Sequence, residues 1–80
     1  MEYKFIDISD TTIAFNFSEK INSDINSKIV ELSNEINNNF KNFNIISCFP
    51  TYNSLIIDYD PLNTERLILK DKISELIKNF

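Results

Sequence analysis

The 80-residue chain contains no glycine, no histidine and no tryptophan, and it has only one cysteine and two prolines. Without histidine it cannot form a Ser-His-Asp triad or a Cys-His pair, and it lacks the commonest general base at neutral pH. Without glycine it has neither a phosphate-binding P-loop nor a dinucleotide fingerprint. A zinc ion would find neither imidazole nor a second thiolate. These absences exclude most of the motifs by which small enzymes are recognised.

Charge and hydropathy exclude two further classes of partner. Eight basic residues are scattered among twelve acidic ones, whereas nucleic-acid binding requires clustered lysine or arginine to neutralise phosphates. No apolar run approaches the ~20 residues that span a bilayer, and no signal peptide is visible at the N-terminus. The single cysteine, Cys48, allows no internal disulfide and fits a reducing compartment. We therefore expect a cytoplasmic protein that binds neither nucleic acid nor membrane.

Two alternating runs at the start of the chain predict an antiparallel hairpin. Residues 2–9 alternate polar and apolar side chains, and so do residues 12–17. Small polar residues separate the two runs and suit a tight turn, in which Asp10 is a turn residue. The second run places its apolar side chains on one face, which should point into the core: Ile13, Phe15 and Phe17.

The apolar period changes to that of a helix at Ser23. Apolar residues then recur at spacings of three and four and form one stripe, made of Ile25, Ile29, Leu32, Ile36 and Phe40. Asn22 or Ser23 would cap the start of this helix, and the asparagine-rich run at residues 37–44 would end it. Because a small domain needs such a stripe in order to fold, we expect it in the core.

The second half of the chain repeats the hairpin. Residues 45–52 predict a third strand with an edge or bulge at Pro50, because proline cannot donate a ladder hydrogen bond. Residues 52–54 would turn the chain, and residues 54–60 predict a fourth strand. Asn53 is expected to have a positive φ in this turn, since asparagine tolerates the left-handed region and no glycine is available.

The last segment predicts a second helix. Asp60 or Asn63 would cap it, and Pro61 would lie in its first turn, where a missing N–H costs little. Its apolar face would consist of Leu69, Ile73, Leu76, Ile77 and Phe80. The order β-β-α-β-β-α predicts an α+β two-layer sandwich, in which both helices cover one face of a four-stranded, mainly antiparallel sheet. Residues 1–80 would form a single domain.

Two carboxylates and one thiol are the remaining candidates for chemistry. Asp58 and Asp60 lie two apart on a predicted strand and so could bind Mg²⁺ or act as acid and base. A solvated sheet edge and a helix cap are the simpler interpretation. Cys48 lies in an apolar strand, which favours a buried structural thiol over a nucleophile. We assign no catalytic residue and no metal ligand, and we expect the outer sheet face to meet an attached domain or partner.

Two segments, taken in order, resemble one family. ISDTTIAFNFSEKINSDINSKIVELSNEI (8–36) resembles a turn, strand and helix entry of that family, and PTYNSLIIDYDP (50–61) resembles its Pro-x-Tyr-Arg-Ser strand ending in Tyr-Asp-Pro. The family is that of the kinase A inhibitor KipI, whose members are also described as the PxpB component of 5-oxoprolinase or as the first component of allophanate hydrolase. The resemblance covers nearly the whole chain but only the family's N-terminal domain. It implies that a cyclophilin-like C-terminal domain, absent here, follows in a longer protein.

This resemblance implies a non-catalytic domain that helps assemble an ATP-dependent 5-oxoprolinase, or an allophanate hydrolase-like, complex. Its partners would be its own C-terminal domain and the other subunits. ATP would be used by the complex, with no cofactor in this segment. An alternative is a regulatory module that inhibits a sporulation histidine kinase. A third is a small standalone enzyme that uses Asp58 and Asp60.

The positions that carry the resemblance are expected to be structural or to lie at an interface. They are Asp10, Pro50, Tyr52, Asn53, Ser54, Tyr59, Asp60 and Pro61. Two positions depart from the family pattern. Ser9 stands where the family often has glycine, and Asn53 stands where it often has arginine. Any role of that arginine is therefore not carried over to this chain.

Overall fold

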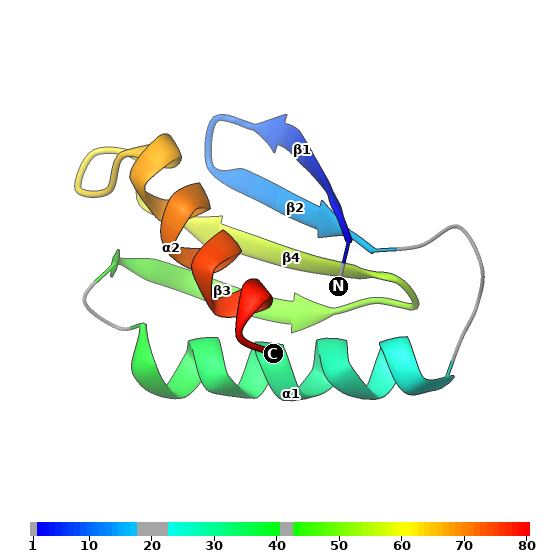
Figure 1. The fold of residues 1–80 in the computed structure, drawn as a ribbon. Helices are drawn as coiled ribbons and strands as arrows, with labels where there is room; N and C mark the ends of the chain where they lie inside the picture. Colours follow the sequence, from blue (N-terminus) through cyan, green and yellow to red (C-terminus); the bar gives the residue numbers. More distant parts are fainter. Residues whose placement is uncertain (1, 18–22, 41–42) are drawn as a thin grey trace.

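The computed structural model describes residues 2–17, 23–40 and 43–80 of the chain. Its elements are, in order, β1 (Lys4–Ser9), β2 (Thr12–Asn16), α1 (Ser23–Asn39), β3 (Ile45–Pro50), β4 (Ser54–Tyr59) and α2 (Arg66–Lys78). This is the predicted order, and the α+β class is confirmed (Figure 1). Within the described ranges, no helix is both long and apolar enough to cross a membrane.

The four strands form one sheet in the order β1-β2-β4-β3, and every neighbouring pair is antiparallel. Each hairpin supplies two adjacent strands, and the contact between β2 and β4 joins the two hairpins in the middle of the sheet. Phe15 lies opposite Phe5 on one side and Leu55 on the other. Directly opposed residues of an antiparallel pair share a face, so these three side chains lie on the same face of the sheet.

That inner face carries the core, and both helices cover it. The predicted stripe of α1 is confirmed: Ile29, Leu32 and Ile36 are buried, and Ile25 and Phe40 pack partly buried against the same cluster. On α2 the buried residues are Leu69, Ile73 and Ile77. From β2 and β4 the core receives Ile13, Phe15, Phe17, Leu55, Ile57 and Tyr59. Each fully buried apolar side chain contributes about 1.5–3 kcal/mol, so this one cluster dominates the stability of the domain.

Polar side chains of α1 hold this helix along β3. Ser33 Oγ and Asn37 Nδ2 each donate to the backbone carbonyl of Cys48, at 3.1 Å. Near the start of the helix, Asn26 Nδ2 donates to the carbonyl of Thr51 at 3.3 Å. The edge formed by β3 is therefore flanked by α1, as Figure 1 shows, whereas β1 forms the other edge of the sheet.

The predicted start of the second helix is wrong. Neither Asp60 nor Asn63 caps α2, because Glu65 occupies the N-cap position, and Pro61 lies before the helix instead of in its first turn. Asp60 holds a turn: its Oδ1 accepts a hydrogen bond from the backbone N–H of Leu62 at 3.0 Å. A carboxylate that bonds the backbone two residues on stabilises an Asx-turn in place of a helical start. The expected cap of α1 cannot be compared, because Asn22 and the Ser23 side chain lie outside the described part of the chain.

The predicted positive φ of Asn53 is also wrong, although the chain does turn between β3 and β4 as expected. The turn is closed by Thr51 and Ser54. The Thr51 N–H donates to the Ser54 carbonyl at 2.8 Å, and the Ser54 N–H donates to Thr51 Oγ1 at 3.1 Å. A side-chain oxygen thus replaces one backbone acceptor, and the turn avoids the left-handed geometry that tight two-residue hairpins require.

Among the described residues, the positive φ belongs to Asn44, at 54°, between α1 and β3. Its backbone carbonyl accepts from the Asp60 N–H at 3.0 Å, and its Nδ2 donates to Thr64 Oγ1 at 3.2 Å. Thr64 Oγ1 in turn donates to the Phe43 carbonyl. Asparagine is among the few residues that tolerate this region, and its side chain here also ties two loops together.

We predict that Leu32→Ala destabilises the domain by about 2–5 kcal/mol, because it removes a fully buried side chain and leaves a cavity. Urea unfolding followed by circular dichroism measures this change. Val30→Ala on the same helix is the matched control, since Val30 is 39% exposed. A midpoint for Leu32→Ala that equals that of the control would mean that the α1 stripe is not the core.

We predict opposite rankings of glycine and alanine at two asparagines. Asn44→Ala should be less stable than Asn44→Gly by about 1 kcal/mol, because alanine resists the left-handed region whereas both variants lose the side-chain hydrogen bond. At Asn53 the ranking should reverse, with Ala more stable than Gly by about 0.4–1 kcal/mol, because glycine gains more freedom on unfolding. Thermal unfolding of the four variants tests the assignment, and equal rankings at both sites would contradict it.

Candidate functional site

The sheet face turned away from both helices carries a continuous apolar row. In the strand registers, Ile6 lies opposite Ala14, Ala14 opposite Ile56, and Ile56 opposite Phe49. Residues directly opposite one another share a face, and the alternation that buries Phe15 and Leu55 places their neighbours on the other side. These four residues therefore cross all four strands. We call this face the outer face and these residues the apolar row.

The residue at the centre of the apolar row is buried, and the residues at its ends are exposed. Ala14 is only 2% exposed although no helix covers it, because the longer Ile6 and Ile56 stand on either side. Ile6 is 41% exposed and Phe49 is 45% exposed. The outer face is thus partly apolar, and the row is a packed strip instead of isolated side chains.

A polar row lies on one side of this strip and is centred on Asp58. Thr12 Oγ1 donates to Asp58 Oδ1 at 2.6 Å, and Ser47 Oγ donates to Asp58 Oδ2 at 2.8 Å. The three residues are neighbours on β2, β4 and β3. Because both bonds favour the carboxylate, that of Thr12 most, the pKa of Asp58 is held below its ordinary value. Asp58 therefore links three strands across the outer face.

A second polar row borders the apolar strip on its other side. Asn16 Nδ2 donates to Ser54 Oγ at 3.0 Å across the β2–β4 pair, and Lys4 lies opposite Asn16 on β1. The outer face therefore consists of an apolar centre between two polar rows.

The two carboxylates that the sequence suggested as a pair, Asp58 and Asp60, bond to different partners. Asp58 lies within the polar row, whereas Asp60 Oδ1 and Oδ2 accept from the Leu62 N–H and from Asn63 Nδ2 in the loop after β4. In the part of the chain that the structure describes, no three His, Cys, Asp or Glu side chains lie together as metal ligands would. What these carboxylates do is hold strands and a turn in place.

Cys48 lies in the core, as the sequence predicted. Its side chain is 6% exposed. Burial raises the pKa of the Cys48 thiol to about 11, and a hydrogen bond with Ser33 opposes this only in part. A thiol with so high a pKa remains protonated at neutral pH and is a poor nucleophile.

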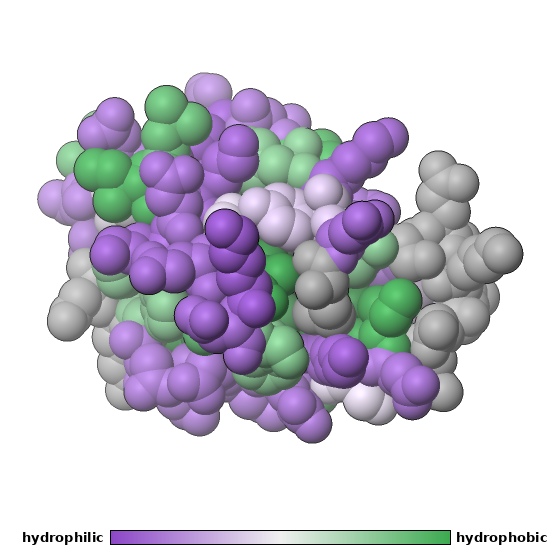
Figure 2. All heavy atoms as spheres, in the orientation of Figure 1, coloured by the Kyte–Doolittle hydropathy of each residue, from purple (hydrophilic) through white to green (hydrophobic). Residues whose placement is uncertain are grey.

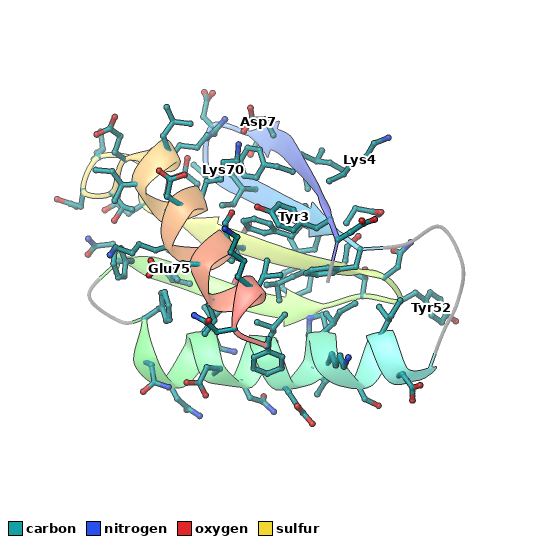
Figure 3. The ribbon with its side chains drawn as sticks, viewed as in Figure 1. Tyr3, Lys4, Asp7, Tyr52, Lys70 and Glu75 are labelled. Carbon is teal, nitrogen blue, oxygen red and sulfur yellow. The ribbon has the colours of Figure 1, made fainter. Side chains whose placement is uncertain are left out.

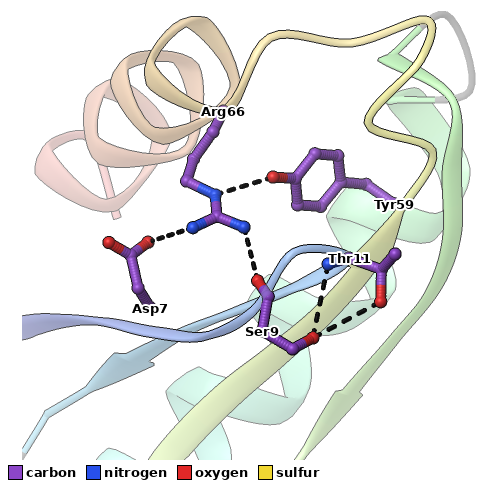
Figure 4. A network of polar contacts seen from close by, with 5 residues as sticks. All are labelled: Asp7, Ser9, Thr11, Tyr59 and Arg66. Atoms are coloured by element: carbon purple, nitrogen blue, oxygen red, sulfur yellow. Dashed lines mark hydrogen bonds and ion pairs between the residues drawn. The ribbon is translucent and has the colours of Figure 1, made fainter.

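Sequence reasoning missed Arg66, which organises a polar cluster at one end of the sheet (Figure 4). Arg66 Nε donates to Tyr59 Oη at 2.7 Å, and Nη1 pairs with Asp7 Oδ1 at 2.9 Å. Nη2 donates to the carbonyl of Ser9. The hydrogen bond to Tyr59 is the main cause of a pKa of Arg66 above its ordinary value. Arg66 therefore fastens the start of α2 to the ends of β1 and β4.

A signal for this cluster was present in the sequence. Arg66 is the only arginine of the chain, and it directly follows the loop after the Tyr59-Asp60-Pro61 motif. A planar guanidinium with several fixed donors suits a junction of three elements better than a lysine would. Farther along α2, Ser74 Oγ hydrogen-bonds to Tyr3 Oη, and Lys70 Nζ lies 4.7 Å from the centre of the Phe5 ring. Figure 3 shows Tyr3 and Lys70 between β1 and this helix.

The residues carrying the motif resemblance fall at the two ends of the sheet. Pro50 ends β3, Ser54 begins β4, and Tyr52 and Asn53 lie in the turn between them, where Tyr52 is 72% exposed and projects outward (Figure 3). Asp10, Tyr59, Asp60 and Pro61 lie at the opposite end, where the Tyr59 N–H donates to the Thr11 carbonyl at 2.9 Å. Tyr59 itself is buried beneath Arg66. The structure thus does not bring these positions together into one site.

An open hollow lies between the end of α1 and α2. It measures about 220 Å³ and is lined by Phe40, Lys72, Glu75, Leu76 and Asn79. A hollow below ~300 Å³ is smaller than the usual small-molecule pocket, so the outer face is the more extensive candidate surface.

Comparisons with known proteins point to one family. The family described as "Carboxyltransferase domain, subdomain C and D" matches residues 3–80. Protein PH0987 of Pyrococcus horikoshii superposes with a TM-score of 0.79 at 21% identity, over 90% of this chain and 33% of that one. At this identity the likeness shows the fold alone. No curated protein matches the chain.

A second solved structure is the N-terminal domain of the histidine kinase inhibitor KipI of Bacillus subtilis. Its TM-score is 0.63 at 25% identity, over 78% of this chain and 60% of that one. The chain therefore spans about one third of the first structure it matches and three fifths of the second.

We predict that the stabilising effect of the Asp58 carboxylate disappears in acid. Its folded-state pKa lies below the ordinary 3.8, so the bonded carboxylate stabilises the fold above that pH. As the pH falls through the lower folded pKa, this contribution is lost. The difference in free energy of unfolding between the native chain and Asp58→Asn should therefore be largest at neutral pH and should shrink below about pH 4.

Urea unfolding at neutral and acid pH measures this difference. In a Thr12→Val, Ser47→Ala background the two donors are absent, so Asp58→Asn should change stability by nearly the same amount at both pH values. A pH-independent effect of Asp58→Asn in the native background would show that the two hydrogen bonds do not hold its charge.

Proposed function

Since the chain belongs to the family of the carboxyltransferase domain, subdomain C and D, we propose that it is a non-catalytic N-terminal domain of a KipI/PxpB-type protein. Its role is to help assemble an ATP-dependent 5-oxoprolinase, or an allophanate hydrolase-like, complex in the cytoplasm. ATP is used by the assembled complex, and this segment itself holds no cofactor. A further domain follows it in the longer protein.

The observation that carries this proposal is a pair of exposed apolar surfaces on opposite sides of the sheet. One is the apolar row of the outer face. The other, which we call the helix-side patch, consists of Leu62, Leu67 and Ile68, which are 92%, 61% and 50% exposed. In Figure 2 apolar side chains gather at the upper left, over the start of α2 and the loop before it. Large exposed apolar groups of this kind mark contact surfaces, and a domain that joins two bodies needs two of them.

The polar chemistry of the domain supports the same role. Asp58 is bonded to two hydroxyl groups, Asp60 holds a turn, and Arg66 fastens a helix. These groups stabilise the scaffold and are committed to internal partners. A standalone enzyme that uses Asp58 and Asp60 as a pair is disfavoured, because the two carboxylates serve separate hydrogen-bond sets.

The alternative is a regulatory module that inhibits a sporulation histidine kinase. The likeness to the N-terminal domain of KipI, named as a histidine kinase inhibitor, favours it. Both proposals describe a domain that acts by protein contact, and they differ in the partner.

Deletion of the gene separates the candidates. Extracts of the deletion strain should lose ATP hydrolysis that depends on 5-oxoproline, and the purified complete polypeptide should restore it. The 80-residue chain alone should hydrolyse neither 5-oxoproline nor ATP, because it lacks histidine and any phosphate-binding glycine loop.

Two results would redirect the assignment. An unchanged extract, together with inhibition of sporulation-kinase autophosphorylation by the complete polypeptide, would establish the regulatory alternative. Turnover by the 80-residue chain that is lost in Asp58→Ala but kept in Asp71→Ala, on α2, would instead establish a small carboxylate enzyme.

A further inference from the structure

The apolar row and the bonded side chains beside it are arranged so that a partner can cover them without replacing hydrogen bonds. Its apolar row is closed at the centre, where Ala14 is 2% exposed. On one side the Asp58 oxygens are already held by Thr12 and Ser47, and on the other Asn16 is bonded to Ser54. Burying polar groups that are already paired avoids the penalty for unsatisfied ones. The face therefore suits a partner that supplies mainly apolar contact.

The size of this face limits what can cover it. Strands of five or six residues, with about 3.3 Å per residue and about 4.8 Å between strands, make a face of roughly 350 Å². Stable complexes between separate proteins bury about 800 Å² on each partner. Even twice the area of the outer face would fall short of that value. A second copy or a separate protein would therefore be held weakly by this face alone.

Contacts between domains of one chain need a smaller buried area than contacts between separate proteins. They bury about 600–1,500 Å² in total, which is as little as about 300 Å² on each side. A tether keeps the partner at an effective concentration in the millimolar range, so a small interface remains occupied. The outer face fits this class of contact by area.

A similar protein has a chain long enough to contain such a tethered domain. PH0987 has the same fold over the matched region, and that region is 33% of its chain. About two thirds of a polypeptide of that kind therefore lie outside the matched part.

We propose that the outer face is the docking surface for another domain of the same polypeptide, which covers the apolar row in cis. This inference rests on the proposed function, in which the chain is one domain of a longer protein. It assigns the outer face to the tethered domain and leaves the helix-side patch for other subunits. The occupant is an apolar surface that meets Ile6, Ile56 and Phe49 across the sheet.

Hydroxyl-radical footprinting tests this assignment by comparing the 80-residue chain with the complete polypeptide encoded by the gene. Oxidation of Phe49 and Ile56 should be several-fold slower in the complete polypeptide, with both samples monomeric by analytical ultracentrifugation. Oxidation of Leu67 and Ile68 on the helix-side patch should be unchanged, which makes these residues the internal control.

A substitution in the row provides a second readout. In the complete polypeptide, Phe49→Asp should return Ile56 to the oxidation rate that it has in the 80-residue chain. Leu67→Asp should leave that rate low. Because Phe49 is 45% exposed and Leu67 is 61% exposed, both variants should fold, and near-ultraviolet circular dichroism checks this. Phe49→Ser replaces Phe49→Asp if the charged variant unfolds.

Three results would contradict the inference. Equal oxidation of Phe49 in both proteins would overturn the docking assignment, while the extract assay would still decide the proposed function. Protection that appears in the 80-residue chain together with a concentration-dependent doubling of mass would assign the face to a second copy and overturn the inference. A gene that ends with the codon for Phe80 would overturn both proposals.

Discussion

The pairing of β2 with β4 is the contact on which the rest of the structure depends. These two central strands come from different hairpins, and they bring Ile13 against Ile57 and Phe15 against Leu55. The inner face formed in this way is wide enough to receive both helices. On its other side the same pairing sets Ala14 beside Ile56, so the apolar row exists because the two hairpins meet in this register. Core and outer face are thus two consequences of one alignment.

The elements and their faces were predictable because periodicity reports burial directly. The stripe from Ile29 to Ile36 and the alternation of Leu55, Ile57 and Tyr59 both follow from one-sided packing, which a sequence records residue by residue. The predictions for Asn53 and Pro61 failed for a different reason. Both followed local preference, whereas the hydroxyl of Thr51 and the carboxylate of Asp60 determined the conformation through hydrogen bonds of their own.

The candidate site could be predicted only in outline. An outer face that meets an attached domain or partner was expected, but the continuity of its apolar row depends on strand order and register, which join Ile6 to Phe49 across four strands. Arg66 was missed because its three partners lie outside its own helix, on β1 and at the end of β4. Contacts of this kind appear only once the chain is folded. The absence of glycine has a visible structural counterpart, since Asn44, Thr51 and Asp60 shape with side chains the turns that glycine would otherwise allow.

Because α1 lies beside β3, the two edges of the sheet are not equally open to further strands. Strand edges are templates on which further strands can add, and proteins with two open edges can stack into endless ribbons. Here Ser33 and Asn37 of α1 occupy the carbonyl of Cys48 on β3, so that edge is guarded by a helix. A further strand would therefore add at the other edge, β1, beyond Ser9, whose carbonyl accepts from Arg66. If a second copy added there through its own β1, the open edges of both chains would be paired, and the assembly would stop at two chains.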